Sequence, residues 1–138
     1  MVCLYCGNET SVKNSRLQKR ANAVWRRREC TECHATVTTL EKIDLATAVL
    51  VRTNTLTEPF SRDRLLVSIY ESCKHRKDAL GSSIALTDTI ISNIYPYIRH
   101  AEVQKDVIIK ESLKVLHAFD PAAGVYYAAY HPKTGTKK

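Results

Sequence analysis

The sequence lacks most of the features on which enzymes and membrane proteins depend. Its 138 residues include only four glycines and no GxxxxGK[ST] segment, so a glycine-rich phosphate cradle has no place. No motif assembles a Ser/His/Asp or Cys/His set, and no apolar run approaches the roughly 20 residues of a membrane span. The N-terminus has no basic stretch followed by an apolar one, which argues against a secretory signal. We therefore expect a cytoplasmic protein that is neither an enzyme nor bound to a membrane.

Charge and apolar content differ along the chain. The formal net charge is +7, and the 44% hydrophobic and 25% charged residues are typical of a globular protein. A basic balance favours polyanionic partners such as nucleic acid or nucleotides. Residues 1–44 are rich in cysteine, arginine and threonine, whereas residues 45–131 carry most of the Leu, Ile and Val at helical spacing. We predict an α+β protein with two domains, 1–44 and 45–131, and a basic, disordered tail over 132–138.

Two CxxC pairs dominate the first region. In a reducing compartment, this pattern indicates a metal site rather than disulfides. Each pair lets two thiolates reach one ion from a tight turn, and two pairs complete a tetrahedral Zn²⁺ shell with no open position, so the site is structural. A rubredoxin-like iron site uses the same ligands. His34 is a competing ligand that four cysteines make unnecessary. The predicted metal ligands are Cys3, Cys6, Cys30 and Cys33.

Three consecutive arginines stand directly before the second pair. The arginine fork suits phosphate groups and the O6/N7 edge of guanine. A metal-bound turn would fix the strand that carries them, on which Arg26 and Arg28 share one face while Arg27 and Trp25 share the other. Trp25 either stacks on a base or ribose or fills the small core. A solvated charge run is the alternative for the arginines. The predicted DNA-binding residues are Arg16, Arg26, Arg27 and Arg28.

Local signals predict the remaining elements. Strands are expected at 23–30 and 35–42, with a loop or a poorly formed strand at 15–23. In the second region, the patterns predict a strand at 47–52, a helix capped by Ser61 and a chain break at 81–83. A helix is expected from about Thr87, which Pro96 kinks or ends, followed by helices at 104–118 and 121–130. Asp120 is the predicted cap of the last helix, with Pro121 at its first position. Cys73 falls on the apolar stripe of the first of these helices, so we expect it to be buried.

Several stretches, in order along nearly the whole chain, resemble one known family. They are Cys3-Leu4-Tyr5-Cys6-Gly7, Ser15-Arg16-Leu17, Arg26-Arg27-Arg28-Glu29-Cys30-Thr31-Glu32-Cys33, Thr38-Thr39-Leu40-Glu41 and Glu58-Pro59-Phe60. These stretches resemble those of the NrdR transcriptional repressors of bacterial ribonucleotide reductase genes. The resemblance implies a small N-terminal β zinc ribbon followed by a mostly helical, ATP-cone-like, nucleotide-binding domain.

The same resemblance implies a mechanism. ATP or dATP in the cone would change how protomers assemble into homo-oligomers, and only one assembly would bind a double-stranded DNA operator in the bacterial nucleoid. The implied nucleotide contacts are Arg52, Arg64, His75 and Arg76, for which ordinary surface charge is the alternative. Three tyrosines, Tyr126, Tyr127 and Tyr130, are expected to pack the cone rather than line the nucleotide base. An alternative function is a nucleotide-sensing interaction module without operator specificity.

Overall fold

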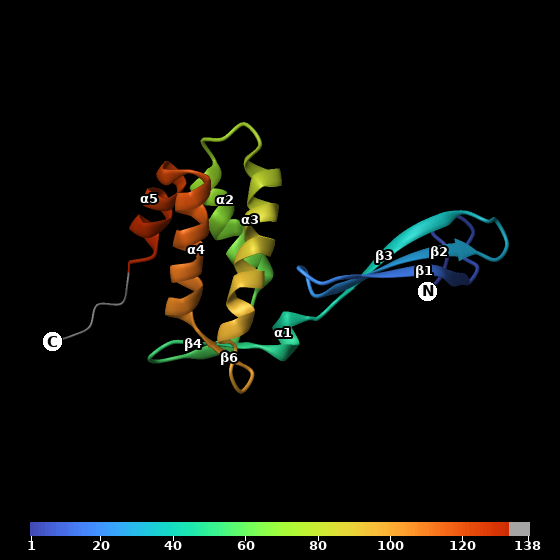
Figure 1. Cartoon of the computed structure of the whole chain (residues 1–138), viewed down its shortest axis with the longest axis horizontal. Coiled ribbons are helices and arrows are strands. Elements are labelled where there is room, and N and C mark those ends of the chain that lie inside the picture. Colours follow the sequence, from blue (N-terminus) through green and yellow to red (C-terminus); the bar gives the residue numbers. More distant parts are fainter. Residues whose placement is uncertain (133–138) are drawn as a thin grey trace. The chain divides into compact units, whose positions relative to one another are not determined.

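The computed structural model describes residues 1–132 and divides into two compact units, Met1–Ile43 and Asp44–Lys138, which we call the ribbon unit and the helical unit (Figure 1). The predicted α+β class is confirmed, because a small antiparallel sheet precedes a mostly helical region. The predicted tail lies outside the described residues apart from Pro132. Within residues 1–132, no helix combines the length and apolar character needed to cross a membrane.

The ribbon unit is a three-stranded antiparallel sheet in the order β1-β2-β3. Its strands are β1 (Thr10–Gln18), β2 (Ala23–Cys30) and β3 (Thr36–Lys42), so the second and third strands confirm the predicted ones. The segment 15–23, expected to be a loop or a poorly formed strand, comprises the end of β1, a turn at 19–22 and the first residue of β2. Although β1 is polar, it pairs with β2 from Thr10↔Cys30 to Gln18↔Ala23, so its neighbour satisfies its backbone groups. A bulge between Val12 and Asn14 shifts the register once.

The helical unit places four longer helices on a small mixed sheet in the order β5-β4-β6. Strand β4 pairs antiparallel with β5 and parallel with β6. The strands are β4 (Leu50–Arg52), β5 (Thr57–Pro59) and β6 (Glu102–Gln104). The helices are α1 (Leu45–Ala48), α2 (Arg62–Cys73), α3 (Ala79–Ile94), α4 (Lys105–Phe119) and α5 (Pro121–Tyr130), with a 3₁₀ turn at Tyr95–Tyr97.

Most helix signals are confirmed. Ser61 accepts a hydrogen bond from the N–H of Arg64 and caps α2, and Asp120 accepts one from the N–H of Ala122 and caps α5. Helix α3 ends at Ile94, just before the turn that contains Pro96. The predicted strand at 47–52 is too long, because Asp44 caps a short helix at its start and only Leu50–Arg52 pairs as a strand.

The predicted chain break at 81–83 is also wrong. Helix α3 begins at Ala79 rather than near Thr87, because the carboxylate of Asp78 accepts a hydrogen bond from the N–H of Gly81. A Cβ atom at Gly81 would lie 2.5 Å from an oxygen of that same carboxylate, so glycine makes room for the cap. Ser83 is fully buried, and its hydroxyl donates to the carbonyl of Ala79 at 2.6 Å. Capping and burial therefore outweigh the weak helix propensity of this segment.

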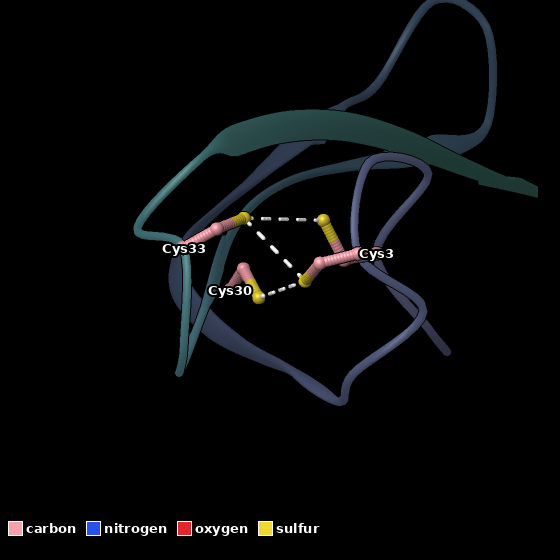
Figure 2. A group of neighbouring side chains, drawn as sticks. Cys3, Cys30 and Cys33 are labelled. Carbon is pink, nitrogen blue, oxygen red and sulfur yellow. Dashed lines mark hydrogen bonds between the residues drawn. The ribbon is translucent and has the colours of Figure 1, made fainter.

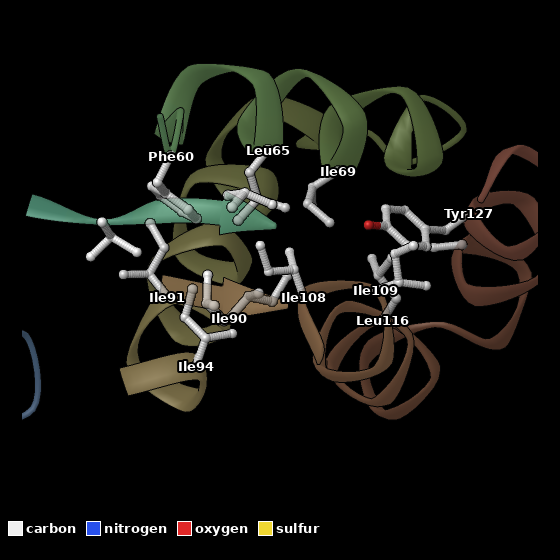
Figure 3. Close-up of a cluster of buried hydrophobic side chains, with 14 of the residues drawn as sticks. Phe60, Leu65, Ile69, Ile90, Ile91, Ile94, Ile108, Ile109, Leu116 and Tyr127 are labelled. Atoms are coloured by element: carbon white, nitrogen blue, oxygen red, sulfur yellow. The ribbon is translucent and has the colours of Figure 1, made fainter. Parts of the chain in front are cut away.

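One apolar core fills the helical unit (Figure 3). Figure 3 shows side chains from α2, α3, α4 and α5 converging over the sheet. Cys73 is fully buried, as predicted. Of the three C-terminal tyrosines, only Tyr127 packs into this core; Tyr126 and Tyr130 remain 42% and 69% exposed. The core consists of Val49, Val51, Phe60, Leu65, Ile69, Cys73, Ile90, Ile91, Ile94, Val103, Ile108, Ile109, Leu116, Ala123 and Tyr127.

Candidate functional site

Two tight turns bring four cysteine thiols together at one end of the ribbon unit. Their Sγ atoms all lie within 4.8 Å of one another. Figure 2 shows Cys3, Cys30 and Cys33 pointing toward a common centre. Each turn is followed by a residue in the left-handed region, Gly7 (φ 76°) and His34 (φ 57°), which lets the chain reverse after the second cysteine of the pair.

The spacing of the sulfurs fits a tetrahedral ion. The Sγ–Sγ distances are 3.6 Å for Cys3–Cys33, 3.4 Å for Cys6–Cys30 and 3.6 Å for Cys6–Cys33. Four sulfurs about 2.3 Å from a central Zn²⁺ would lie about 3.8 Å apart. The ring of His34 instead contacts the carboxylate of Glu29 through Nδ1, at 3.3 Å, and the cluster consists of the four cysteines without it.

The electrostatics of the cluster also favour a cation. Backbone N–H groups of Cys33 and Glu32 lower the pKa of the Cys30 thiol to about 6. Although the N–H of Ala35 stabilises the Cys33 thiolate, desolvation and the thiols of Cys6, Cys30 and Cys3 raise the Cys33 pKa to about 12. Four thiols packed this closely cannot all ionise unless a positive ion lies among them.

The four arginines predicted to bind DNA lie on two faces of the sheet. Directly opposite residues share a face, so Arg26 lies with Ser15 and Thr39, and Arg27 lies with Asn14 and Thr38. Arg28 belongs to the face of Arg26, and Arg16, which pairs with Trp25, belongs to the face of Arg27. We call these the Arg26 face and the Arg27 face. Strand alternation alone predicts this division within β2.

The guanidinium groups on the Arg26 face are already engaged. Arg26 donates from Nε and Nη2 to Glu41 at 3.2 and 3.0 Å, and from Nη1 to the Ser15 hydroxyl at 3.3 Å. Arg28 donates to the carbonyl of Thr10 at 3.5 Å, and its Nε is buried. On the Arg27 face, Arg16 and Arg27 are exposed, and within residues 1–132 no hydrogen bond or ion pair engages either side chain.

In the helical unit, two adjoining cavities bring together two of the predicted nucleotide contacts. A cavity of about 580 Å³ is lined by Arg52 from β4, the β4–β5 loop, the start of α4 and the end of α5. A second, of about 260 Å³, is lined by Arg64 from α2. The two cavities share the side chains of Glu58, Lys105, Ile109 and His131.

Two of the cations around these cavities pair with half-buried carboxylates. Arg52 lies 3.2 Å from Glu102, and Arg64 lies 2.8 Å from Glu58. Lys105, the first residue of α4, makes no ion pair among residues 1–132. His131 stacks on Tyr127 with ring centroids 4.2 Å apart, and its Nε2 lies 2.7 Å from the Ser68 hydroxyl. Burial, followed by the charge of Lys105, lowers the pKa of His131.

The other two predicted nucleotide contacts lie elsewhere. His75 and Arg76 follow α2 at the end far from β4 (Figure 1). The Nε2 of His75 lies 2.8 Å from Asp120, and Arg76 lies 3.4 Å from the same carboxylate and over the ring of Phe119. Neither side chain lines the two cavities. The hydrogen bond that Asp120 accepts from His75 is the main cause of the lowered pKa of the Asp120 carboxyl.

Comparison with known proteins identifies the family. Residues 1–41 match the family model "Transcriptional repressor NrdR-like, N-terminal domain", a zinc ribbon. A transcriptional repressor NrdR of Symbiobacterium thermophilum is 31% identical over 95% of this chain and 87% of its own length, and one of Sphingopyxis alaskensis is 33% identical over 95% and 84%. The chain belongs to the NrdR family. A shorter match, to the NrdR of Corynebacterium diphtheriae, is 43% identical over 55% of this chain and 49% of the relative.

Membership of the NrdR family agrees with two expectations from the sequence. NrdR proteins are named transcriptional repressors, which is a non-enzymatic function. The matching NrdR model describes a zinc ribbon, and the four-thiol cluster of this chain supplies the ligand set that such a Zn²⁺ site requires.

Two residues that line the cavities belong to no motif in the sequence. Lys105 and His131 line both cavities, yet neither belongs to a motif quoted above. A basic residue in the first turn of the helix predicted at 104–118 was the available signal for Lys105, since helix N-termini attract anions. His131 had no such signal, because only the packing of α5 brings it beside Ser68 and Lys105.

Proposed function

We propose that this protein is a zinc-dependent, nucleotide-responsive repressor that binds a double-stranded DNA operator, as a homo-oligomer, near bacterial ribonucleotide reductase genes. It would act in the cytoplasm, at the nucleoid. The observation that carries the proposal is the four-thiol cluster at the end of β2, the strand that also bears three consecutive arginines. The family of the chain supports repression as the activity.

Zinc has a structural role in this proposal. Cys3, Cys6, Cys30 and Cys33 would hold one ion, and four thiolate ligands leave no position for a substrate or a reactive water. Bound zinc supplies folding free energy that a region this small cannot obtain from apolar burial. The ion therefore fixes the strands whose arginines meet the phosphates and bases of DNA.

The nucleotide, ATP or dATP, would bind in the two adjoining cavities. Their combined lining offers Arg52, Arg64 and Lys105 as cations for phosphates, and a cavity of about 580 Å³ falls within the usual range for small-molecule sites. Phosphate oxygens would replace the carboxylates of Glu102 and Glu58 as partners of the two arginines. His75 and Arg76, predicted contacts outside these cavities, would not touch the same ligand.

Binding would act by shifting populations between assemblies. A nucleotide that binds one oligomer more tightly than another favours the first, and only that form would present its ribbon units to paired operator boxes. The shift is limited by the difference in nucleotide affinity between the two assemblies.

Light scattering coupled to size-exclusion chromatography tests this proposal directly. The full chain is run with ATP, with dATP and with neither, and we expect at least one nucleotide to change the oligomer mass. Lys105→Gln should raise the nucleotide concentration needed for half of the mass change about tenfold or more, because it removes a positive charge from both cavities. Lys110→Gln is the matched control, since Lys110 is exposed on the same helix and lines neither cavity.

The outcomes separate the candidate functions. No change of mass with either nucleotide would contradict nucleotide control. The remaining function would be DNA binding by the ribbon unit without a response to nucleotide. A change of mass without preference for any DNA duplex over a scrambled one would instead favour the nucleotide-sensing interaction module. Equal responses of the two lysine variants would contradict the location of the nucleotide site.

A further inference from the structure

We infer that the Arg27 face of the ribbon unit, and not the Arg26 face, contacts DNA, and that Asn14 and Arg27 together read base edges. This inference rests on the proposed DNA-binding function and deepens it by assigning the surface. Of the four arginines predicted to bind DNA, it keeps Arg16 and Arg27 as DNA contacts and excludes Arg26 and Arg28. It also adds Asn14 as a contact.

A row of exposed polar side chains crosses the sheet on the Arg27 face. Asn14 in β1, Arg27 in β2 and Thr38 in β3 lie directly opposite one another in register and share one face. All three are exposed. Within residues 1–132, no hydrogen bond engages the side chain of Asn14 or Arg27. Their donors and acceptors are therefore available to a partner.

The chemistry of this row is that of base recognition. Arginine can donate two parallel hydrogen bonds to O6 and N7 of guanine, asparagine pairs in the same way with N6 and N7 of adenine, and threonine contacts either base type or the methyl group of thymine. A two-stranded β-ribbon fits the major groove, where these edges are presented. Neighbouring strands lie about 4.8 Å apart, so Asn14 and Arg27 can reach adjacent bases at once.

The second row adds phosphate contacts and an aromatic surface. Arg16, Trp25 and Leu40 lie opposite one another on the same face. Lys42 lies on this face too, opposite Ala23 of β2. Arg16 and Lys42 are exposed, and Trp25 is half-buried beside them. The only acidic side chain paired within this face, Glu29, is already partnered by Lys13 at 3.7 Å and His34 at 3.3 Å. The face therefore presents a positive potential to a polyanion.

The Arg26 face lacks these properties. Arg26 is only 33% exposed, and all three of its guanidinium nitrogens have partners. The carboxylate of Glu41 lies on this face and would repel phosphate groups. Arg28 sits between Val12 and Val37 in register, half-buried. A phosphate approaching this face would meet two half-buried cations that already have partners, one anion and apolar neighbours.

Two charge-matched double variants test the assignment. Arg16→Gln/Arg27→Gln removes two cations from the Arg27 face, and Arg26→Gln/Arg28→Gln removes two from the Arg26 face. The probe is a fluorescent duplex that the unmodified full chain, loaded with zinc, selects from a randomised pool, and a scrambled duplex is the reference. Each titration is repeated with ATP, with dATP and with neither.

We expect the Arg27-face variant to lose affinity for the selected duplex by about 10- to 100-fold, and the salt dependence of its binding to fall by about one phosphate contact. Asn14→Ala should lower the preference for the selected over the scrambled duplex while leaving the salt dependence unchanged. The Arg26-face variant should bind nearly as the unmodified protein does.

The single tryptophan gives an independent readout of the face. Because Trp25 is the only tryptophan and lies on the Arg27 face, the selected duplex should quench its fluorescence in the unmodified protein and in the Arg26-face variant. Unchanged Trp25 fluorescence at saturating duplex would overturn the inference. Stoichiometric zinc and the melting temperature verify folding; if Arg26→Gln/Arg28→Gln does not fold, Arg26→Gln alone takes its place.

Failure of this inference can be told apart from failure of the proposed function. If the folded Arg26-face variant loses its preference for the selected duplex, the choice of face is refuted, whether or not the Arg27-face variant loses it too. The proposal that the protein binds DNA would still stand. If the unmodified protein prefers no duplex in any nucleotide state, the repressor proposal itself is refuted.

Discussion

The two units of this protein are stabilised in different ways. Among the described residues, the ribbon unit buries only Cys3, Ala23 and Cys30, two of which belong to the thiol cluster. Among residues 44–132, fifteen apolar side chains are buried in one cluster, most of which Figure 3 shows. Apolar burial contributes roughly 1.5–3 kcal/mol for each large side chain, so the helical unit can hold itself together, whereas the ribbon unit cannot.

This difference bears on where each unit can place its functional residues. A sheet fixed by an ion at one end needs no apolar face, and both faces of β1 and β2 are left for polar and basic side chains. The four longer helices of the helical unit each bury one side, and Arg52 and Lys105 lie together where α4 and α5 meet the edge of the sheet.

Removal of the metal should show the largest difference in stability between the two units. Structural zinc contributes on the order of 10 kcal/mol in small zinc-binding peptides. Cys30→Ser, or a strong chelator, should therefore unfold the ribbon unit completely while the helices persist. Trp25 fluorescence reports the ribbon unit, and far-ultraviolet circular dichroism reports the helices.

Cys73→Ala is the matched control for this prediction. It also removes a buried sulfur, but from the core of the helical unit, so zinc content and Trp25 fluorescence should not change. If Cys30→Ser leaves Trp25 fluorescence and the melting profile intact, the ribbon unit does not depend on the ion, and the contrast between the units fails.

A core truncation in α2 should destabilise the helical unit instead of the ribbon unit. Ile69 is fully buried, and Ile69→Ala should destabilise the helical unit by about 2–5 kcal/mol because it leaves a cavity. Val67→Ala, on the same helix but with Val67 58% exposed, should cost much less. Urea titration followed by circular dichroism measures both, and equal costs would show that this core is not what stabilises the unit.

The sequence predicted the features that depend on short-range pattern. The CxxC spacing, the caps at Ser61 and Asp120 and the end of a helix before Pro96 are local signals, and the structure has the thiol cluster and the helix ends in those places. The segment at 81–83 was misjudged because Asp78 and the buried Ser83 outweigh local propensity.

Features that depend on tertiary packing were less accessible. The two cavities gather residues from β4, α2, the start of α4 and the end of α5, so no window of sequence contains them. His75 and Arg76 stand close in sequence to Arg64, but α2 carries them to the far end of the unit. Helix length therefore decides which basic residues can share one ligand, and this was visible only in the fold.

A smaller effect is expected at the cap of α5. Asp120 accepts hydrogen bonds from the N–H of Ala122 at 2.9 Å and from His75 at 2.8 Å, so Asp120→Ala should lower the melting temperature of the helical unit by about 4–8 °C. The bond to His75 holds the pKa of Asp120 below its usual range in the folded state. The contribution should be fully present above the ordinary carboxyl pKa and be lost as pH falls through the lowered value.

Thermal melts of the unmodified protein and Asp120→Ala across the acidic range measure this contribution. The gap between their melting temperatures should be largest near neutral pH and close as Asp120 becomes protonated. A gap that widens in acid would contradict the sign of the pKa shift. Zinc content and Trp25 fluorescence at neutral pH should be the same in both proteins, because the cap lies in the helical unit.

The smallest effect concerns the surface ion pair of the ribbon unit. Arg26 and Glu41 are joined at 3.0 Å, but the Glu41 side chain is 65% exposed, and exposed pairs of this kind contribute about 0.2–1 kcal/mol. A double-mutant cycle with Arg26→Gln and Glu41→Gln, measured by urea unfolding of the zinc-loaded protein, should give a coupling free energy in that range and a weaker one at high salt. A coupling of several kcal/mol would mean that side-chain contacts, rather than the metal, stabilise the sheet. In that case the variants on the Arg26 face would lose DNA affinity through unfolding, so this cycle also determines how the binding data for the two faces must be interpreted.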